Sequence, residues 1–370
     1  MRPVLLTGRN FPVANMADHN AFTKIVRKFS GTGPTMLKFV VKAIAALILA
    51  LGLPSIAVAK EGAVRPLTVA KTAEIVTVGF YPINVYSVDP ASSTFTYDGY
   101  VWFRWKGRID PTETVEFTNA VDKSSLTKEF LYDAPQVASD GSKYQIMRIE
   151  SQFLKPFSLS SFPLDSHNLS VVLEDSLSGA DRLVYEIDQA DTGYAPDLEI
   201  SGWKLNGWSH ERLVVDYASA FGDRTVAQAS QFARISFNLN ISRPQSYFVW
   251  KLLLPLVVVL CGAWIALLLN PVLTETRAAL PASALLTTVF LQQSYTATLP
   301  ETGGLVLLDK IYVVAYVLIV VTLGRVILKS MNIEQQSDAQ IQSLRRHDAI
   351  ALAVQAAIFV TCSALLVVFR

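Results

Sequence analysis

The segment from Glu275 to Pro300 (ETRAALPASALLTTVFLQQSYTATLP) is long enough to cross a bilayer as a helix but is rich in polar residues. Three segments that are far more apolar surround it in the sequence. Polar groups are costly in hydrocarbon and normally face protein or water. We therefore predict that the neighbouring segments screen it from lipid and that it lines a wet path.

One face of this predicted helix has a distinctive order of side chains. Positions three and four residues apart lie on the same face of a helix, which has about 3.6 residues per turn. On one such face the side chains are a carboxylate, a hydroxyl, two bulky apolar residues and an amide, with small residues between and after them. The positions are Glu275, Ala279, Ser283, Leu286, Phe290, Gln293 and Ala297. A ring of carboxylates selects cations, and a ring of apolar side chains can gate a pore by dewetting. The periodicity alone also allows a helix buried in a bundle, with its hydroxyls bonded to neighbouring helices.

The C-terminal part of the chain, residues 244–370, is predicted to be a transmembrane pore domain. Its candidate spans are about 250–270, 276–297, 304–329 and 346–369. Four spans of this length place both ends of the mature chain on the same side of the membrane. Basic residues flank the third-to-fourth connection: Arg325, Lys329, Arg345 and Arg346. Because positively charged loops stay inside, we expect the preceding domain to lie outside.

Residues 60–243 have the pattern of an exported, strand-rich domain. The stretch 94–106 alternates and places two sets of side chains on opposite faces: Tyr100, Trp102 and Arg104 against Val101, Phe103 and Trp105. Similar runs follow at short spacing, separated by Asp-Gly, Asp-Pro, Ser-Gly and Asn-Gly turns. Many short strands at regular spacing predict an antiparallel sandwich. The predicted fold class is an all-β extracellular sandwich followed by an all-α four-helix transmembrane domain.

Residues 1–59 are predicted to be a leader, with a signal peptide at 36–59. Lys38 and Lys42 precede an apolar run that is too short for a comfortable span. Ala57-Val58-Ala59 then provides the small residues of a cleavage site. We expect cleavage after Ala59 and translation from Met36, although a long leader from Met1 is the alternative.

Composition agrees with a membrane protein and excludes several other classes. Hydrophobic residues make up 51% of the chain, which is too many for an ordinary soluble protein of this size. The formal net charge of +1 gives no electrostatic reason to expect a nucleic acid partner. Cys261 and Cys362 both lie in apolar runs, so no disulfide is predicted in the exported domain.

The sequence lacks the common motifs of enzymes and metal sites. It contains no HExxH, GxSxG or P-loop motif and no Cys/His metal cluster, so we predict neither an enzyme nor a bound cofactor or metal. The alternative to a pore is a non-conducting sensor or binding protein, with a sandwich held on a membrane anchor. A membrane anchor does not require four spans or a polar span, so this pattern favours the pore.

A series of short motifs runs from the strand-rich domain into the spans. They are Trp105 after an alternating strand, Phe162-Pro163-Leu164-Asp165, Ile241-Ser242-Arg243, Pro255 within the first span and Leu299-Pro300 at the end of the second. In this order and spacing the chain resembles the pentameric ligand-gated ion channels, the Cys-loop receptor superfamily, and specifically its bacterial members. The resemblance covers roughly Leu67 to the C terminus. It implies a homopentamer in a lipid membrane, namely the cell inner membrane, with the N-terminal domain in the periplasm.

The resemblance also implies roles along the second span, which would line an axial pore. Glu275 takes the position of the family's intracellular carboxylate ring, and Arg277 takes the basic position just inside it. Ser283 takes the hydroxyl ring and Leu286 the gate. Leu286 and Phe290 form the expected closed-state barrier, because two apolar rings leave nothing to replace the hydration shell of an ion.

Ion selectivity is expected to follow from the same helix. Five copies of Glu275 would concentrate negative potential in a narrow pore of lowered dielectric, which predicts permeation by monovalent cations. The alternative is that Arg277 partly neutralises this charge. Pro281 lies inside the helix, and since proline removes a backbone donor and clashes with the preceding turn, a kink is expected.

Gating requires contact between the sandwich and the pore. The resemblance places Asp165, Arg243 and the connection that begins at Pro300 at this interface. The cysteines of the family's loop are missing here, so the loop must be held by packing of Phe157, Phe162 and Pro163.

The resemblance also implies a ligand site between subunits, whose residues are assigned only by their positions in the sequence. Its candidate residues are Tyr100, Tyr132, Glu174, Asp175, Tyr217 and Phe221. Aromatic faces with carboxylates suit a small ammonium ligand, although these aromatics could equally belong to the core or to strand surfaces. Protons are the competing stimulus, because clustered carboxylates raise one another's pKa and because His167 and His210 titrate in the right range.

Overall fold

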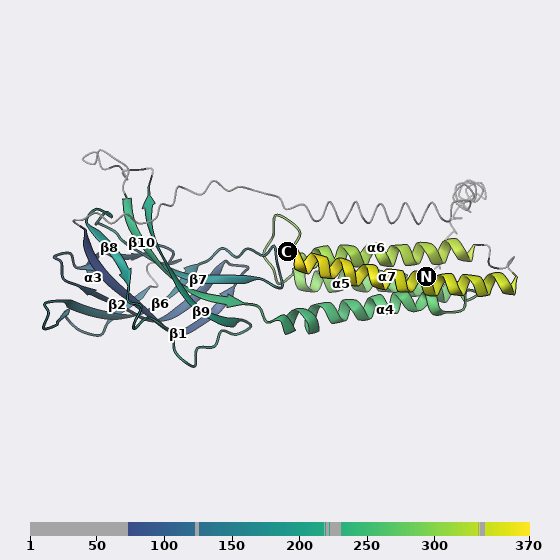
Figure 1. Cartoon of the computed structure of the whole chain (residues 1–370), viewed down its shortest axis with the longest axis horizontal. Helices are drawn as coiled ribbons and strands as arrows, with labels where there is room; N and C mark the ends of the chain where they lie inside the picture. Colours follow the sequence, from purple (N-terminus) through teal and green to yellow (C-terminus); the bar gives the residue numbers. More distant parts are fainter. Residues whose placement is uncertain are drawn as a thin grey trace, which may run out of the picture.

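The computed structural model describes residues 73–122, 126–217, 219, 222, 231–331, 333 and 337–370. It has a strand-rich half followed by a bundle of long helices, which lie side by side along the longest axis of the molecule (Figure 1). The predicted leader (1–59), its signal peptide (36–59) and Phe221 lie outside the described residues.

The described residues of the strand-rich half form two sheets. The first has the order β4 (Thr127–Phe130), β6 (Lys143–Leu154), β2 (Thr94–Trp105), β1 (Glu74–Asp89) and β8 (Leu183–Ile187), with β5 (Gln136–Val137) also paired to β6. The second has the order β3 (Val115–Phe117), β7 (Ser166–Asp175), β10 (Gln231–Ser242) and β9 (Lys204–Asp216), and the short helix α3 (Pro111–Thr114) precedes β3. All described strand pairs are antiparallel except β1–β8. The predicted sandwich of antiparallel strands therefore holds, apart from this parallel pair.

Apolar side chains of both sheets form a shared core. Val101, Phe103 and Trp105 of β2 are buried in it, as the alternation of that strand predicts. Phe80 of β1 stacks on Phe237 of β10 with ring centroids 5.2 Å apart, which joins the first sheet to the second. Burying a side chain of this size contributes about 1.5–3 kcal/mol.

The opposite face of β2 differs from the simple alternation at Trp102. Arg104 is exposed and Tyr100 is half-buried, but Trp102 is buried. Its indole lies over Gly79, where a Cβ atom would be 2.0 Å from the ring, and its Nε1 donates to Asp188 at 3.1 Å. A glycine on the neighbouring strand thus lets the ring lie flat, and the pattern within β2 alone does not contain that information.

The helical half begins with a π-helical segment that leads into α4. The helices are η1 (Tyr247–Leu253), α4 (Leu254–Leu268), α5 (Thr274–Thr296), α6 (Leu307–Ser330) and α7 (Asp338–Val368). Helix α5 continues through Pro281, which is buried. Helix α7 starts ahead of the predicted span because Ser337 caps it, its backbone N–H donating to Gln340 Oε1 at 2.8 Å.

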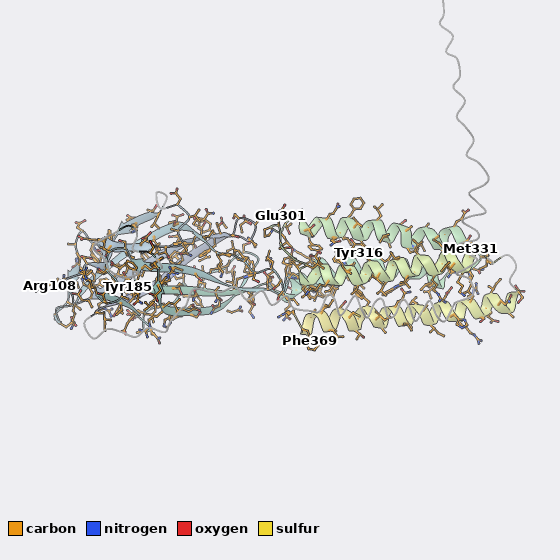
Figure 2. All side chains as sticks on the ribbon, turned by 90° about the horizontal axis from the view of Figure 1, so that it is seen from above. Arg108, Tyr185, Glu301, Tyr316, Met331 and Phe369 are labelled. Atoms are coloured by element: carbon orange, nitrogen blue, oxygen red, sulfur yellow. The ribbon has the colours of Figure 1, made fainter. Side chains whose placement is uncertain are left out.

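Among the residues that the structure describes, three helical stretches are long and apolar enough to cross a membrane, namely Tyr247–Leu268, Leu307–Ser330 and Asp338–Val368. Helix α5 is not among them, because its many polar residues lower its hydropathy. In Figure 2, Glu301 lies at the junction with the strand-rich half, Met331 at the far end of the helices, and Phe369 back near the junction. The C terminus thus returns to the end of the bundle to which the sheets attach.

Candidate functional site

The stripe predicted on α5 faces away from the other helices of its own chain. All of its members are exposed: Glu275, Ala279, Ser283, Leu286, Phe290, Gln293 and Ala297. The large apolar members stand out, since Leu286 is 58% exposed and Phe290 is 60% exposed. The buried residues of α5 lie on the opposite face: Arg277, Pro281, Ala284, Thr288 and Tyr295. The single chain therefore leaves this stripe, which we call the α5 stripe, without cover from its own described helices.

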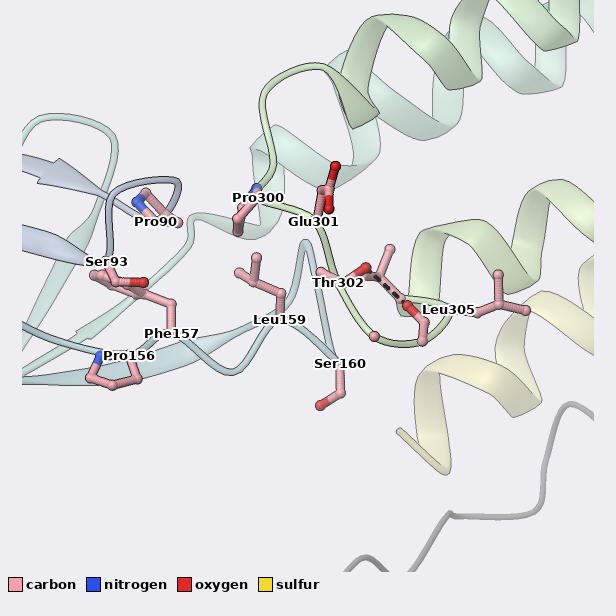
Figure 3. Close-up of a pocket in the computed structure, with 13 residues that line it drawn as sticks. Pro90, Ser93, Pro156, Phe157, Leu159, Ser160, Pro300, Glu301, Thr302 and Leu305 are labelled. Atoms are coloured by element: carbon pink, nitrogen blue, oxygen red, sulfur yellow. Dashed lines mark hydrogen bonds between the residues drawn. The ribbon is translucent and has the colours of Figure 1, made fainter.

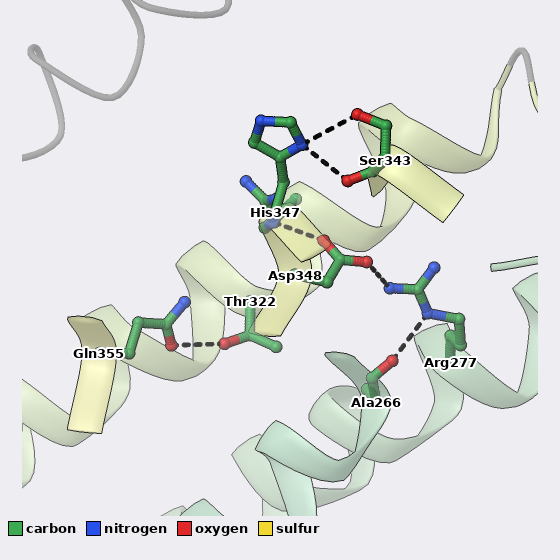
Figure 4. A network of polar contacts seen from close by, with 8 residues as sticks. Ala266, Arg277, Thr322, Ser343, His347, Asp348 and Gln355 are labelled. Atoms are coloured by element: carbon green, nitrogen blue, oxygen red, sulfur yellow. Dashed lines mark hydrogen bonds and ion pairs between the residues drawn. The ribbon is translucent and has the colours of Figure 1, made fainter. Parts of the chain in front are cut away.

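Arg277 belongs to the buried face and not to the α5 stripe. Its side chain is 3% exposed, and its Nε donates to the carbonyl oxygen of Ala266 at the end of α4, at 2.7 Å. Its guanidinium also donates to Asp348 of α7 at 2.5 Å, and Arg325 of α6 donates to the other oxygen of that carboxylate at 2.8 Å (Figure 4). Arg277 is thus directed toward α4 and α7, which is not the arrangement in which it would neutralise Glu275 from beside it.

A second polar contact joins three helices deeper in the bundle. The side-chain oxygen of Gln355 in α7 accepts from Trp264 Nε1 of α4 at 2.9 Å and from Thr322 Oγ1 of α6 at 2.8 Å. All three side chains are buried. A buried donor that is left without an acceptor destabilises the fold by about 1–3 kcal/mol. These hydrogen bonds therefore favour the rotation of α7 that places Gln355 against both α4 and α6.

The outer end of α5 is held by a carboxylate at the start of α6. Asp309 accepts from the hydroxyl of Tyr295 at 2.5 Å and from the amide of Gln292 at 3.1 Å. Gln292 in turn accepts from the hydroxyl of Tyr316 at 2.7 Å. These contacts use two polar residues of α5 that lie off the stripe, so both faces of this helix carry polar side chains.

At the junction of sheets and helices, Asp165 and Arg243 form the predicted pair. Arg243 Nε donates to Asp165 Oδ1 at 2.8 Å, and the Asp165 side chain is only 1% exposed. The guanidinium of Arg243 lies between two aromatic rings, 4.9 Å from the centroid of Phe162 and 4.3 Å from that of Trp203. His167 contacts the other oxygen of Asp165 at 2.6 Å. The pair is therefore buried and in contact with two aromatic rings and a histidine, unlike an exposed surface salt bridge.

The loop that carries Asp165 also contacts α5 and α6 directly. Phe162 is buried and stacks on Tyr295 of α5 with ring centroids 6.3 Å apart. The backbone N–H groups of Leu307 and Leu308 donate to the carbonyl oxygens of Ser160 and Phe162 at 3.0 and 3.2 Å. Beside this contact, an open hollow of about 420 Å³ lies between the loop and the connection after Pro300 (Figure 3). Aromatic packing and backbone hydrogen bonds thus hold the loop in which cysteines are missing.

The predicted ligand residues on the first sheet lie on or near its surface. Tyr100 is half-buried on the outer face of β2, opposite Arg148 of β6. Tyr132 is exposed in the connection after β4 and packs edge-on against Tyr144, with centroids 6.4 Å apart. Their contact with a ligand stays a prediction.

The predicted carboxylates at the end of β7 are buried and have partners within the chain. Glu174 accepts from Arg234 of β10 and from the hydroxyl of Tyr217, the latter at 2.9 Å. Asp175 accepts from Thr114 and from the backbone of the turn that follows. Burial and the hydrogen bond to Glu174 raise the pKa of Tyr217 above its ordinary value. A ligand that contacts either carboxylate would have to displace one of these partners.

Three further residues contact the predicted site residues but cannot be identified from the sequence: Arg234 beside Glu174, Asp348 beside Arg277 and Trp203 beside Arg243. Each lies far in sequence from its partner, and each sits in a run whose local pattern already has a plain explanation as strand, helix or turn. In the described ranges, no group of three or more His, Cys, Asp or Glu side chains could hold a metal ion.

Comparison with known proteins identifies similar ion channels. The chain is 22% identical over 305 residues to a proton-gated ion channel of Gloeobacter violaceus, covering 78% of this chain and 82% of that protein. It is 24% identical over 166 residues to the pH-sensitive chloride channel 2 of Anopheles gambiae, covering 45% of this chain and 27% of that protein. It is 23% identical over 211 residues to a gamma-aminobutyric acid receptor subunit beta-like protein of Drosophila melanogaster, covering 54% and 39%. No family model matches the chain.

Proposed function

We propose that this chain, a member of the superfamily of pentameric ligand-gated ion channels, forms a homopentameric channel whose pore is lined by the α5 stripe. Its relatives are channels, and the protein is not an enzyme. The observation that carries the proposal is the exposure of the whole stripe, including Leu286 and Phe290, on a helix whose opposite face is buried. Five copies turned toward a common axis would shelter that stripe from lipid.

In this proposal, residues 244–370 are the four-helix transmembrane domain, and residues 60–243 form the extracellular ligand-binding domain. Helix α5 is too polar to count as a lipid-facing span, and an assembly in which α4, α6 and α7 separate it from lipid would remove that difficulty. A bacterial inner membrane with the sandwich in the periplasm fits the basic residues around the α6–α7 connection.

We propose that Glu275 selects cations and that Leu286 and Phe290 form the gate. The named relatives include a chloride channel as well as a proton-gated channel, so ion selectivity depends on the pore residues of this chain. Glu275 is exposed at the end of the stripe, while the positive charge of Arg277 is buried and shared with Asp348. This separation supports a net negative pore mouth and permeation by monovalent cations.

Opening is proposed to pass through the junction formed by Asp165, Arg243 and the connection after Pro300. A change in the sandwich that moves Asp165 would move Arg243, which lies four residues before the start of η1. The stimulus is a small extracellular ligand such as an amine, bound near Tyr100 and Tyr132, or protons.

The test is a recording of current from the purified full-length protein in a planar bilayer. Steps to low pH and a panel of amines should each be applied, and at least one should evoke a cation current. A folded protein that never conducts, under any of these conditions, would favour the alternative of a membrane-anchored sensor.

A further inference from the structure

His167 is a buried histidine that directly contacts the carboxylate of the junction. Its Nε2 lies 2.6 Å from Asp165 Oδ2, and its side chain is 4% exposed. The same carboxylate binds Arg243 through its other oxygen at 2.8 Å. One buried carboxylate thus binds one permanent cation, Arg243, and one imidazole ring.

The ring of His167 is enclosed by aromatic side chains. It meets Phe157 edge-on at 4.9 Å and Trp203 at 5.5 Å between ring centroids. Trp203 is also the ring on which the Arg243 guanidinium lies. His167 therefore contacts Asp165 directly and shares the Trp203 ring with Arg243.

Charged residues lie in each chain segment that meets at His167. Asp165 precedes β7, Arg243 follows β10, Lys155 follows β6 and Lys204 begins β9. Asp165 contacts the ring and Arg243 contacts the same carboxylate, whereas Lys204 is exposed and Lys155 is half-buried. Among the contacts described for His167, the charged partner is Asp165.

We infer that His167 is a proton-binding site through which extracellular pH controls the junction between sandwich and pore. Neutral His167 donates one hydrogen bond to Asp165. The protonated ring brings a full positive charge to a carboxylate that Arg243 already holds, in a buried site where solvent screens poorly. Two cations then compete for the Asp165 carboxylate, which weakens the ion pair between Asp165 and Arg243. This inference rests on the proposed channel function and specifies where its proton stimulus acts.

The other described histidines lack this arrangement. His210 lies on β9 beside Trp208, and burial together with Arg212 lowers its pKa below the ordinary value. His347 is exposed and contacts the carbonyl oxygen of Ser343. Within the described residues, His167 is the histidine that pairs with a carboxylate.

The functional test compares two matched variants in the full-length channel. His167→Gln keeps an N–H donor near Asp165 but cannot titrate, and His210→Gln removes a histidine outside the junction. Between pH 8 and pH 5, we expect wild type and His210→Gln to change their current by about fivefold or more, and His167→Gln to lose most of that change. A wild-type current that does not depend on pH, or a pH response retained in His167→Gln, would overturn the inference.

A direct readout of protonation does not require current. Trp203 lies against the ring, so a charged His167 should quench its fluorescence. The measurement is made in a His210→Gln background, which removes the histidine beside Trp208. On lowering the pH from about 8 to about 5, we expect a fluorescence step in that protein, and loss of the step when His167→Gln or Trp203→Phe, which retains the histidine, is added. The same titration in all three proteins would contradict the site.

These measurements also separate the two proposals. A fluorescence step in a protein that never conducts would remove the channel function and, with it, the gating role of His167. Conduction with a pH response unchanged in His167→Gln would remove the proton site alone.

Discussion

At the scale of single residues, Glu275 and Arg277 show how close neighbours in sequence acquire opposite environments. Residues at i and i+2 of a helix point about 200° apart. Glu275 consequently lies on the exposed stripe, and Arg277 reaches the buried carboxylate of Asp348. The charge presented along the stripe at this end of α5 is therefore that of the carboxylate.

Replacing Glu275 with Ala should reduce cation selectivity. In a narrow pore at an effective dielectric near 20, each charge contributes on the order of a few kcal/mol, so the cation-to-anion permeability ratio should fall by about tenfold or more. The measurement is the reversal potential in asymmetric salt. Glu113→Ala, an exposed carboxylate on the sandwich, is the control, and an unshifted potential in Glu275→Ala would remove that residue from the filter.

Leu286→Ser should give channels that open more easily, because a hydroxyl can replace part of the hydration shell of an ion in the closed barrier. The agonist or proton concentration for half-maximal current should fall, and current without stimulus should rise. Thr287→Ser, at an adjacent exposed position that is already polar, should change neither. Wild-type behaviour of Leu286→Ser would count against the gate.

At the scale of elements, the outermost helix α7 is tied to the bundle by polar contacts as well as apolar packing. Asp348 pairs with arginines of α5 and α6, and Gln355 accepts from side chains of α4 and α6. A helix as apolar as α7 gains little from mere contact with its neighbours when lipid surrounds it, so directed contacts decide its rotation.

Removing the charge of Asp348 should destabilise this bundle. Asp348→Asn leaves buried Arg277 without its counter-charge, which costs about 3–5 kcal/mol when one partner of a buried pair is lost. Thermal unfolding of the protein in detergent should show a lower midpoint. Asp338→Asn, in the exposed first turn of the same helix, should leave it unchanged, and equal midpoints for both variants would contradict the role of the pair.

The junction between β7 and η1 offers a second prediction at this scale. Asp165→Asn keeps the shape of the side chain but weakens the pair with Arg243, so channels should reach the membrane in normal amounts yet open poorly. Surface labelling and maximal current together measure this. Asp197→Asn, an exposed carboxylate of the sandwich, is the control, and normal opening of Asp165→Asn would show that the pair is structural only.

At the scale of the whole molecule, the isolated chain leaves apolar surface uncovered in both halves. Leu286 and Phe290 are exposed on α5, and around β4 the exposed apolar side chains include Phe130, Leu131 and Val137. Exposed apolar surface of this kind marks sites of association. Copies of the same chain around one axis would cover both regions at once.

Chemical cross-linking of the protein in membranes should therefore yield a ladder that ends at five subunits. A cysteine placed at Leu286 should react with water-soluble thiol reagents only when the channel is open. A ladder that stops at the monomer, or labelling of position 286 by lipid-borne reagents, would contradict a shared pore.

Much of this arrangement follows from patterns within short windows. The alternation in β2 predicts that Val101, Phe103 and Trp105 face the core, and the helical period predicts one coherent face on α5. The Asp165–Arg243 pair comes from a resemblance in motif order. Long-range partners were beyond reach, as with Arg234 beside Glu174, because nothing in the local sequence of either residue encodes the other.

The sequence by itself determines the two-part architecture, since the periods of two and of about 3.6 residues and the change in hydropathy are local properties of the chain. It also determines that α5 is too polar to face lipid. Only the tertiary structure decides which polar residues of α5 are used inside the subunit and which remain exposed, and that His167 shares a carboxylate with Arg243. Those facts depend on how separate elements are rotated and brought together, and packing across the whole chain sets that rotation.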